Sequence, residues 1–425
     1  MMKLKSIYIN KLFNIERQEF TFYEPDVNYF DNLKVSVIVG ENGTCKTSLL
    51  KFIAETFLYP NIKNKLKNTL QYGFTMKYQI NNREIHLDHK NIHSLENSDY
   101  PKNVIVSTTA LNGKFSTIQK RTNNTSYHYN GPLKSEMLSI VKVLRDPSLE
   151  GAVLELLNLV GYSKSYRIIL PEIDILKNMI QKRKASNEIV NIEEFFKAYD
   201  AISDNHENKP RKKVIYASKI NEYFLDCIQE FMERRINIDF RLEIRKPMND
   251  EWIDIKDMSS GEQAIFNRFF SLLSIVTDNS IILIDEPETH LHPKWLKDYI
   301  YIITILFSKY KAHVIIATHS PFIAAEVPNE CILGLVKDFP TGEVSQYEVT
   351  NSTLGGNPIN ILNDVFDLKS HTGSFTHSII NQIEANIRNG NTDKGIDMYN
   401  DLGTTVKKYS LFNKIKQIVP KEFDK

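Results

Sequence analysis

The sequence contains few cysteines, almost no net charge and no long apolar run. Its three cysteines, Cys45, Cys227 and Cys331, lie far apart without metal-ligand spacing, which argues against a disulfide framework or a zinc site. The formal net charge of +1 provides no overall field that would attract nucleic acid, so any DNA contact requires a local basic patch. No segment approaches the roughly 20 apolar residues of a membrane-spanning helix, and the N-terminus lacks the apolar core of a signal peptide. We therefore expect a cytoplasmic chain without a membrane partner.

The sequence does contain enough apolar residues for a large core. Of its 425 residues, 42% are hydrophobic and 25% are charged, which leaves room for two or three domains. Strand patterns occupy 4–10, 20–23, 34–39, 71–79, 84–87, 103–108, 237–244, 251–255, 281–285 and 313–318. Segment 109–130 is polar and is expected to be a loop, whereas helical spacing dominates 132–223. The pattern predicts an α/β fold in which a mixed sheet carries an antiparallel β layer, with a helical insertion.

The rest of the chain is organised around 281–293, IILIDEPETHLHP. Four aliphatic residues in a row are typical of a strand buried on both faces of a parallel sheet, and Asp285 and Glu286 follow where this strand ends. Ligands of such sheets bind at the carboxyl ends of the strands. Asp285 is therefore placed to hold Mg²⁺, directly or through water, and Glu286 to polarise a water that attacks a phosphate. The alternative is a strand that simply ends in acidic residues at a solvated rim.

A phosphate-binding loop, the P-loop, is predicted at 40–48, GENGTCKTS, because a strand precedes it and an amphipathic helix follows it. Backbone N–H groups would surround an anion, Lys46 would reach the outer phosphates, and the Thr47 hydroxyl would complete a magnesium shell. Cys45 stands where the usual G-x-x-x-x-G-K-[ST] pattern has its second glycine, although its N–H can still donate. Glycine adopts the local geometry most easily, so we expect ATP binding with slow hydrolysis. The alternative is a degenerate loop that no longer binds ATP.

Two further segments flank the Asp-Glu strand. Ser259, Ser260 and Gly261 begin an amphipathic helix, so free N–H groups and hydroxyls would point toward an anion, although an ordinary helix N-cap fits as well. His319 follows the strand at 313–318, where it could sense a terminal phosphate or steady the attacking water. A structural histidine is the alternative at that position.

Two other features leave their roles open. Tyr127, Tyr129 and Gly131, in YHYNG, either pack near a nucleotide base or fill the core. The basic clusters are Lys182-Arg183-Lys184, Arg211-Lys212-Lys213 and Arg234-Arg235. They could contact a phosphate backbone, but the acidic residues nearby are equally typical of a solvated face.

In their order along the chain, the phosphate loop, the SSGE turn, the Asp-Glu strand and the strand ending in histidine resemble the ATP-binding-cassette (ABC) ATPase heads. The resemblance covers about 1–120 and 235–350. It implies an ABC-type P-loop ATPase head that uses ATP and Mg²⁺, with an N-terminal lobe (1–131), a helical insertion (132–234), a C-terminal lobe (235–350) and a helical tail (351–425). In that family two heads sandwich two ATP molecules, and each loop faces the signature turn of the other subunit.

The resemblance also assigns roles to individual residues. The implied ATP contacts are Gly40, Glu41, Asn42, Gly43, Thr44, Cys45, Lys46, Thr47, Ser48, Ser259, Ser260, Gly261 and Glu262. The implied metal ligands are Thr47 and Asp285, Glu286 would be the catalytic carboxylate, and His319 the switch histidine.

Within that family, the compact insertion and the sequences DEPETHLHP and ATHSP look most like the ATPases of the overcoming-lysogenisation-defect (OLD) and RecF-like group. This group includes PtuA of Septu, AriA of PARIS and retron-associated ATPases. Segment 354–368, LGGNPINILNDVFDL, is similar to the segment that follows the head in those proteins. The tail lacks an Asp-x-Asp metal cluster, so we expect no complete Toprim nuclease domain.

The resemblance therefore implies an ATPase of bacterial anti-phage defence. It would form a homodimer or a higher homo-oligomer and control a separate effector protein, a nuclease. A RecF-like DNA-repair clamp that binds duplex DNA directly is the alternative from another class. A non-hydrolysing scaffold, suggested by Cys45, is a third.

Overall fold

The computed structural model describes two compact units, Met1–Phe366 and Asp367–Lys425. The described residues are 1–58, 73–92, 94–108, 115, 120–121, 125–130, 137–182, 192–207, 209, 211–233, 238–366, 373–403 and 406–418. Within this part of the chain, no helix is long and apolar enough to cross a membrane.

The first unit is built on a sheet of eight strands in the order β17-β16-β3-β15-β14-β6-β8-β7. Its strands are β3 (Leu33–Gly40), β6 (Asn103–Thr108), β7 (Lys120–Arg121), β8 (Ser126–Asn130), β14 (Ser280–Asp285), β15 (Ala312–Ala317), β16 (Ile332–Lys337) and β17 (Val344–Tyr347). β16, β3, β15, β14, β6 and β8 run parallel, and the two edge strands pair antiparallel. Every residue of β3, β6, β14 and β15 is buried, as their aliphatic runs predict.

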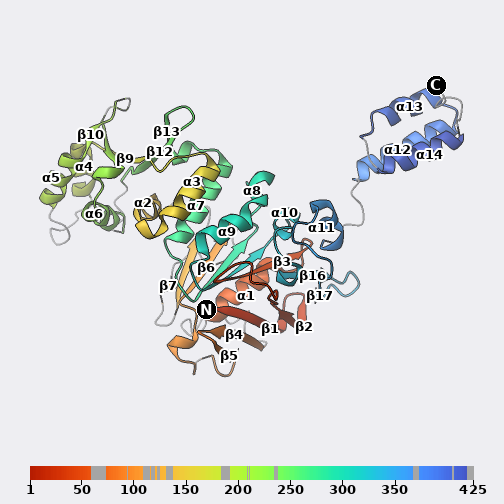
Figure 1. The fold of residues 1–425 in the computed structure, drawn as a ribbon, viewed down its shortest axis with the longest axis horizontal. Coiled ribbons are helices and arrows are strands. Elements are labelled where there is room, and N and C mark those ends of the chain that lie inside the picture. The colour runs from red at the N-terminus through yellow and green to blue at the C-terminus, as the bar shows by residue number, and fades with distance from the viewer. Residues whose placement is uncertain are drawn as a thin grey trace. The chain divides into compact units, whose positions relative to one another are not determined.

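Two layers cover the faces of this sheet (Figure 1). One face packs against helix α1 (Lys46–Leu58) and the antiparallel sheet β2-β1-β4-β5, and Ile281 and Leu283 point into this core. That second sheet comprises β1 (Lys3–Leu12), β2 (Ile15–Thr21), β4 (Phe74–Ile80) and β5 (Arg83–Asp88). Ile282 and Ile284 point to the opposite face, whose core includes α2 (Met137–Arg145), α3 (Glu150–Val160), α7 (Ser260–Leu273) and α9 (Tyr299–Phe307). The predicted α/β class, with a mixed sheet and an antiparallel layer, is confirmed.

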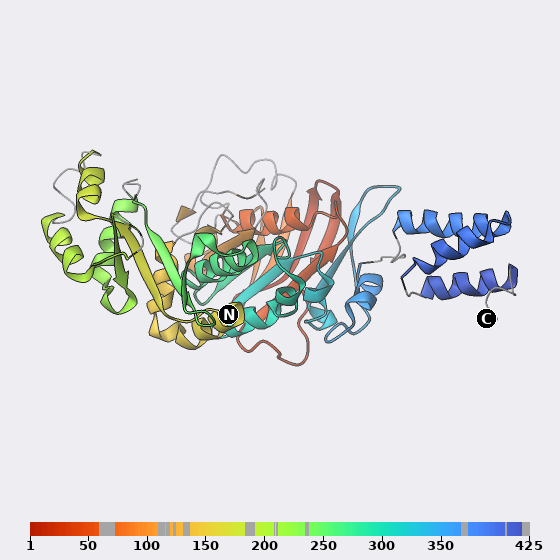
Figure 2. The same ribbon diagram turned by 90° about the horizontal axis from the view of Figure 1, so that it is seen from above.

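The insertion is not purely helical, which corrects the expectation for 132–234. It holds α4 (Ile173–Lys182), α5 (Ile192–Ile202) and α6 (Glu222–Glu233) together with three strands, β9, β10 and β11. These strands join β12 and β13 of the predicted C-terminal lobe in a five-stranded sheet of order β10-β11-β9-β12-β13 (Figures 1 and 2). The strands of this sheet are β9 (Tyr166–Pro171), β10 (Asp204–Asn205), β11 (Lys212–Tyr216), β12 (Arg241–Lys246) and β13 (Glu251–Asp254). In β9, Tyr166, Ile168 and Leu170 face the core, while Arg167 points away from it and pairs with Glu243. This alternation is the two-residue period of a strand.

One further expectation differs from the structure in detail. The polar segment 109–130 is not simply a loop, because β7 and β8 extend the central sheet there and β8 pairs in parallel with β6. The chain after the Asp-Glu strand forms two helices, α8 (Pro293–Lys297) and α9, which are divided at Asp298. The shorter elements of this unit are α10 (Pro321–Ala324), α11 (Pro358–Asp364) and the 3-10 helices Asn97–Asp99, Pro147–Leu149, Ala217–Lys219, Ile255–Asp257 and Asn329–Cys331.

The second unit is helical, as expected for the tail. It contains α12 (Ser374–Arg388), α13 (Thr392–Asn400) and α14 (Val406–Ile418) around a small core of Ile383, Ile387, Leu411 and Ile415. The expected tail begins at 351, whereas the compact division falls after Phe366, and Val365 is buried in the core of the first unit. The domain boundaries at 131, 234 and 350 stay predictions.

Candidate functional site

The loops that carry the predicted motifs leave three neighbouring strands at the carboxyl edge of the central sheet. β3 ends at Gly40, β14 at Asp285 and β15 at Ala317. The parallel registers pair Asp285 with Ala317, and Ala317 with Ile38. The P-loop, the Asp-Glu pair and His319 therefore start side by side, as expected for parallel strands.

Glycine occupies two P-loop positions for different reasons. Gly40 has a φ of 153°, and a Cβ there would lie 2.5 Å from the Leu335 carbonyl oxygen and 2.8 Å from Thr44 Oγ1. Gly43 has a φ of 84°, but no heavy atom lies within 4 Å of where its Cβ would be. Sterics thus require glycine at the first position, and backbone conformation favours it at the second.

Cys45 has a φ of 64°, which lies in the left-handed region. This conformation costs a residue with a side chain about 1–2 kcal/mol, which explains why the usual pattern has glycine here. The Cys45 side chain is half-buried and packs against the core that includes α1. The effect of this residue on hydrolysis stays a prediction.

Lys46, the first residue of α1, is buried and folds its side chain back over the loop. Its Nζ donates to the carbonyl oxygens of Gly40 at 2.9 Å and Glu41 at 3.0 Å. Burial lowers the pKa of Lys46 to about 8, although the carboxylates of Glu286 and Glu288 act in the opposite direction. The ammonium therefore belongs to the same cluster of charges as the Asp-Glu strand.

Thr47 and Asp285 meet directly. Thr47 Oγ1 donates to Asp285 Oδ1 at 2.9 Å, across 238 positions of sequence. A hydroxyl and a carboxylate are the oxygen ligands that Mg²⁺ accepts, so the pair fits this ion. No group of three or more His, Cys, Asp or Glu side chains in the described residues could hold a metal alone, so the remaining ligands would be phosphate oxygens and water.

Glu286 follows Asp285 in an unusual backbone conformation. It has a φ of 46°, and its N–H donates to the Ala317 carbonyl oxygen at 2.9 Å, so β14 and β15 remain joined just beyond their last paired residues. The side chain is half-buried. A left-handed conformation in a residue with a side chain is often found at functional sites, and here it turns the chain sharply after the strand.

Glu288 belongs to this site, although the sequence pattern does not single it out. Its carboxylate accepts from the His319 backbone N–H at 2.6 Å and from Thr318 Oγ1 at 2.8 Å. Burial, and secondarily the charge of Glu286, raises the pKa of Glu288 even though these hydrogen bonds oppose the shift. The available signal is a further acidic residue, three positions after Asp285, in the same turn.

His319 begins the loop after β15 at the same edge. Burial and the nearby Lys46 charge lower its pKa, while Glu286 acts in the opposite direction. The imidazole is therefore neutral at neutral pH and can offer one N–H and one acceptor nitrogen to a ligand.

The predicted signature turn forms a capped helix start. Ser259 is the N-cap of α7, and a capping box joins it to Glu262, whose Oε2 accepts from the Ser259 N–H at 2.9 Å and from Ser259 Oγ at 2.7 Å. A Cβ at Gly261 would lie 2.6 Å from a Trp295 ring carbon, so glycine permits close packing there. Ser259 and Ser260 are exposed. Among the described residues, no hydrogen bond joins this turn to the P-loop, so its ATP contact stays a prediction.

Of the features left open, the tyrosines lie in the core. Tyr127 and Tyr129 are buried, and burial raises the pKa of each, so packing accounts for both. Lys212 and Lys213 pair with acidic side chains, Asp239 at 2.5 Å and, more loosely, Asp200 at 4.0 Å. Gly131, Arg183, Lys184, Arg234 and Arg235 lie outside the described residues.

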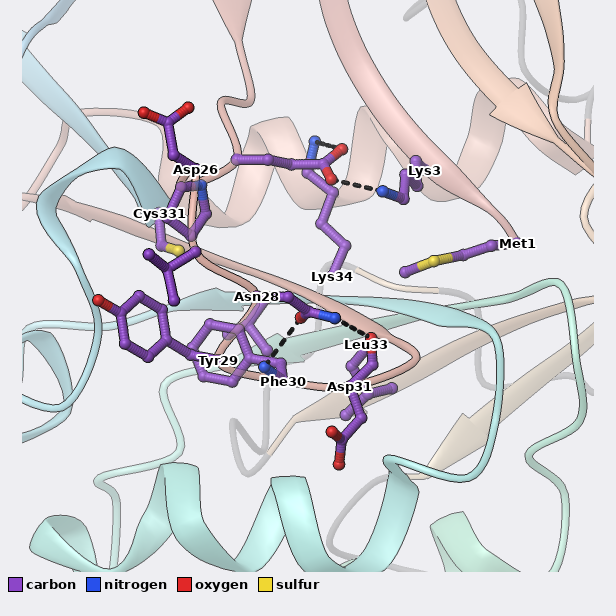
Figure 3. A pocket seen from close by; sticks show the side chains of 14 residues that line it. Met1, Lys3, Asp26, Asn28, Tyr29, Phe30, Asp31, Leu33, Lys34 and Cys331 are labelled. Carbon is purple, nitrogen blue, oxygen red and sulfur yellow. Dashed lines mark hydrogen bonds and ion pairs between the residues drawn. The ribbon is translucent and has the colours of Figure 1, made fainter.

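A separate cavity of about 270 Å³ lies at the amino end of β3 (Figure 3). Lys34 lines it, and its Nζ donates to the carbonyl oxygens of Leu4 at 2.8 Å and Phe22 at 2.7 Å and pairs with Glu24 at 3.5 Å. Burial lowers the pKa of Lys34 to about 8, against the charge of Glu24. Six residues of strand, about 20 Å, separate Lys34 from Gly40. This cavity is therefore distinct from the P-loop site.

In Figure 3, Lys3 and Lys34 lie at one end of this cavity, and Tyr29 and Asp31 at the other. The Asn28 side chain holds together the loop 28–31 that lines the cavity, since its Nδ2 donates to the Asp31 carbonyl oxygen at 2.8 Å. These contacts have a structural explanation and do not define a ligand.

Comparison with known proteins supports an ATPase head. Residues 155–325 match the family described as "AAA domain, putative AbiEii toxin, Type IV TA system". This range includes the signature turn, the Asp-Glu strand and His319, but not the P-loop.

Two curated proteins are similar in sequence. Protein ea59 of Escherichia phage lambda is 23% identical over 407 residues, which are 92% of this chain and 65% of ea59. Septu protein PtuA of Bacillus thuringiensis is 32% identical over 121 residues, which are 28% of this chain and 30% of PtuA. The chain thus spans less than two thirds of the length of each.

Similar solved structures are SMC heads. The SMC head domain from Thermotoga maritima is 13% identical with a TM-score of 0.34, covering 82% of this chain and 100% of that one. The Smc head domain with a coiled coil and joint from Pyrococcus yayanosii is 12% identical with a TM-score of 0.38, covering 85% and 99%. The family match and the converging motifs agree with the predicted resemblance to an ATPase head: residues 155–325 are similar to an AAA domain, and the chain is similar, over part of its length, to Septu protein PtuA.

Proposed function

We propose that this chain is the ATP-binding and ATP-hydrolysing subunit of a bacterial anti-phage defence system. It acts in the cytoplasm, two copies close around ATP, and the nucleotide state controls a separate effector, a nuclease. The support is of two kinds: the arrangement of the motif residues, and the partial similarity to PtuA.

The observation that carries the ATPase proposal is the hydrogen bond between Thr47 Oγ1 and Asp285 Oδ1. It joins the P-loop to the end of β14 and so supports a Mg·ATP site shared by these two segments. Lys46 precedes Thr47 and lies near the same carboxylates, so the charges of Glu286, Glu288 and Asp285 oppose the lowering of its pKa by burial.

The residues present fit both ATP and Mg²⁺. The N–H groups of the first turn of α1 precede its first helical hydrogen bond, from Leu49 N–H to the Cys45 carbonyl oxygen, and are therefore available to phosphate oxygens. Thr47 and Asp285 would hold the metal. When bound, Mg²⁺ would neutralise part of the charge on the phosphate oxygens.

Three residues of the chain then have separate roles in hydrolysis. The Lys46 ammonium leaves the carbonyl oxygens of Gly40 and Glu41 and pairs with the outer phosphates. The Glu286 carboxylate accepts a hydrogen bond from the water that attacks the γ-phosphorus, and the bond to the ADP oxygen breaks as the new P–O bond forms. Neutral His319 donates an N–H to the departing phosphoryl group.

Turnover and binding, measured on the purified full chain, test the ATPase proposal. Replacing Glu286 by Gln keeps the shape of the side chain but removes the base, so ATP should remain bound and the hydrolysis rate should fall about 100-fold or more. Replacing Lys46 by Ala should abolish ATP binding. Glu348→Gln, a change at an exposed carboxylate outside all the motifs, is the control. Parent-rate hydrolysis by Glu286→Gln would contradict the assigned role.

Dimer closure around ATP makes a separate prediction. Light scattering of Glu286→Gln with ATP and Mg²⁺ should show an increase in mass that Ser260→Arg abolishes, because Ser260 is exposed at the start of α7 where a second copy would meet the nucleotide. Ser148→Arg, at another exposed turn, should leave the assembly unchanged. If neither ATP nor Ser260→Arg changes the mass of the assembly, the proposal of a composite site would be contradicted.

The clamp alternative has a distinct signature. Stimulation of the ATPase by duplex DNA without any protein partner would favour a RecF-like clamp over effector control.

A further inference from the structure

The Glu288 carboxylate joins two loops of the candidate site. It projects from the loop after β14 and binds the loop after β15, where Oε1 accepts from the His319 N–H at 2.6 Å and Oε2 from Thr318 Oγ1 at 2.8 Å. Thr318 Oγ1 in turn accepts from the Ser320 N–H at 2.9 Å. One carboxylate therefore orders three consecutive residues around the switch histidine.

The same turn also fixes Glu286. The Thr289 N–H donates to the Glu286 carbonyl oxygen at 3.3 Å, and the Leu291 N–H to the Glu288 carbonyl oxygen at 3.0 Å. Glu286 and Glu288 thus belong to one short rigid turn. A displacement of Glu288 would move the predicted base and the switch histidine relative to each other.

Burial of a second carboxylate beside Glu286 is unfavourable unless strong donors compensate it. Burial and the Glu286 charge both raise the pKa of Glu288, while the hydrogen bonds from His319 and Thr318 favour the ionised form. Apolar packing could fill this space without that cost. A charge-assisted hydrogen bond to a backbone N–H, however, fixes the position of the main chain more closely than apolar packing does.

We infer that Glu288 is a positioning residue for ATP hydrolysis: it holds the main chain of His319 at a set place relative to Glu286. Glu288 itself need not touch ATP. The inference rests on the proposed ATPase function, and it adds a residue that acts on turnover through another residue.

Three substitutions separate positioning from packing. Glu288→Ala removes both acceptors, so kcat should fall about 10- to 100-fold while KM for ATP changes by less than about threefold. In Glu288→Gln, the amide oxygen can accept from the His319 N–H and the amide N–H can donate to Thr318 Oγ1, which has a second lone pair. This variant should recover most of the rate. Glu288→Asp is one methylene shorter and should resemble Ala.

Glu243 provides the matched control. It is a buried carboxylate in β12, away from the candidate site, and is bound by Arg167 at 2.7 Å and Lys209 at 2.5 Å. Glu243→Ala should lower thermal stability, as Glu288→Ala does, but leave kcat unchanged. An equal loss of kcat in both Ala variants would mean that lost stability explains the effect, and the inference would be wrong.

A second measurement does not depend on turnover. In the full chain labelled with ¹⁵N-histidine, the His319 amide proton should move upfield in Glu288→Ala and less in Glu288→Gln, because a strong acceptor is lost. The loss of one resonance in His319→Gln assigns the signal. An unmoved amide in Glu288→Ala would overturn the inference even for a chain that hydrolyses ATP normally. If the amide moves in Glu288→Ala but the parent chain shows no ATPase activity, the contact between Glu288 and His319 is supported and the proposed function is contradicted.

Discussion

Substituting alanine for each of the two P-loop glycines should have different consequences, although both residues have positive φ. At Gly40 the added Cβ would lie 2.5 Å from the Leu335 carbonyl oxygen and 2.8 Å from Thr44 Oγ1. Relieving this overlap should cost about 1–3 kcal/mol, and the backbone conformation about 1–2 kcal/mol more. At Gly43 only the conformational cost applies, because the space around it is open.

The measurement is urea unfolding without nucleotide, followed by ATP binding to each variant. Gly40→Ala should be destabilised by about 2–5 kcal/mol and Gly43→Ala by about 1–2 kcal/mol, each less about 0.4–1 kcal/mol from the stiffer unfolded chain. Gly40→Ala should also lose ATP affinity, because a displaced Gly40 backbone shifts the start of the P-loop, whose N–H groups would face the phosphates. Equal destabilisation of the two variants would refute this reasoning.

Three further predictions follow from the structure. Cys45→Gly should relieve about 1–2 kcal/mol of strain in the loop and raise the hydrolysis rate, and an unchanged or lower rate would show that the cysteine does not slow turnover. Because burial holds the pKa of His313 well below 6.5, the unfolded chain binds one more proton than the folded chain as pH falls below 6.5. The free energy of unfolding should then fall by about 1.4 kcal/mol per pH unit, a slope that urea titrations should find absent in His313→Asn but retained in the exposed control His86→Gln. Gly261→Ala would place a Cβ 2.6 Å from a Trp295 ring carbon and should lower the melting temperature. Adding Trp295→Leu should restore part of the lost melting temperature.

The central sheet could be predicted from the sequence because its strands are buried on both faces. The aliphatic run of β14 leaves little choice of structure, and the P-loop has a fixed order of strand, loop and helix. Ligands gather at the carboxyl ends of parallel strands, so the sequence alone indicates that Thr47 and Asp285 share one metal site, and the hydrogen bond between them agrees with this.

The insertion could not be predicted equally well. The strand β9, YRIILP, is short and almost continuously apolar, and periodicity cannot distinguish such a run from a buried helical segment. Its neighbours in the sheet, β11 and β12, are distant in sequence, so only the folded chain shows the pairing. The same applies to β8, a polar strand that joins the sheet through β6.

Glu288 escapes sequence-based prediction for a related reason. Its importance arises from contacts with Thr318 and His319, which lie about 30 positions further along the chain, and nothing in the local pattern indicates them. A carboxylate after a strand suggests a solvated rim, whereas tertiary packing half-buries this one.

The central claim is that the pairing of Thr47 with Asp285 assembles a Mg·ATP site. The most direct test is calorimetric titration of the full chain with ATP, with and without Mg²⁺, for the parent protein, Thr47→Val and Asp285→Asn. The account predicts binding in the parent that Mg²⁺ strengthens, and loss of this Mg²⁺ effect in both variants. Absence of ATP binding by the parent chain, or binding that Mg²⁺ strengthens equally in all three proteins, would contradict it.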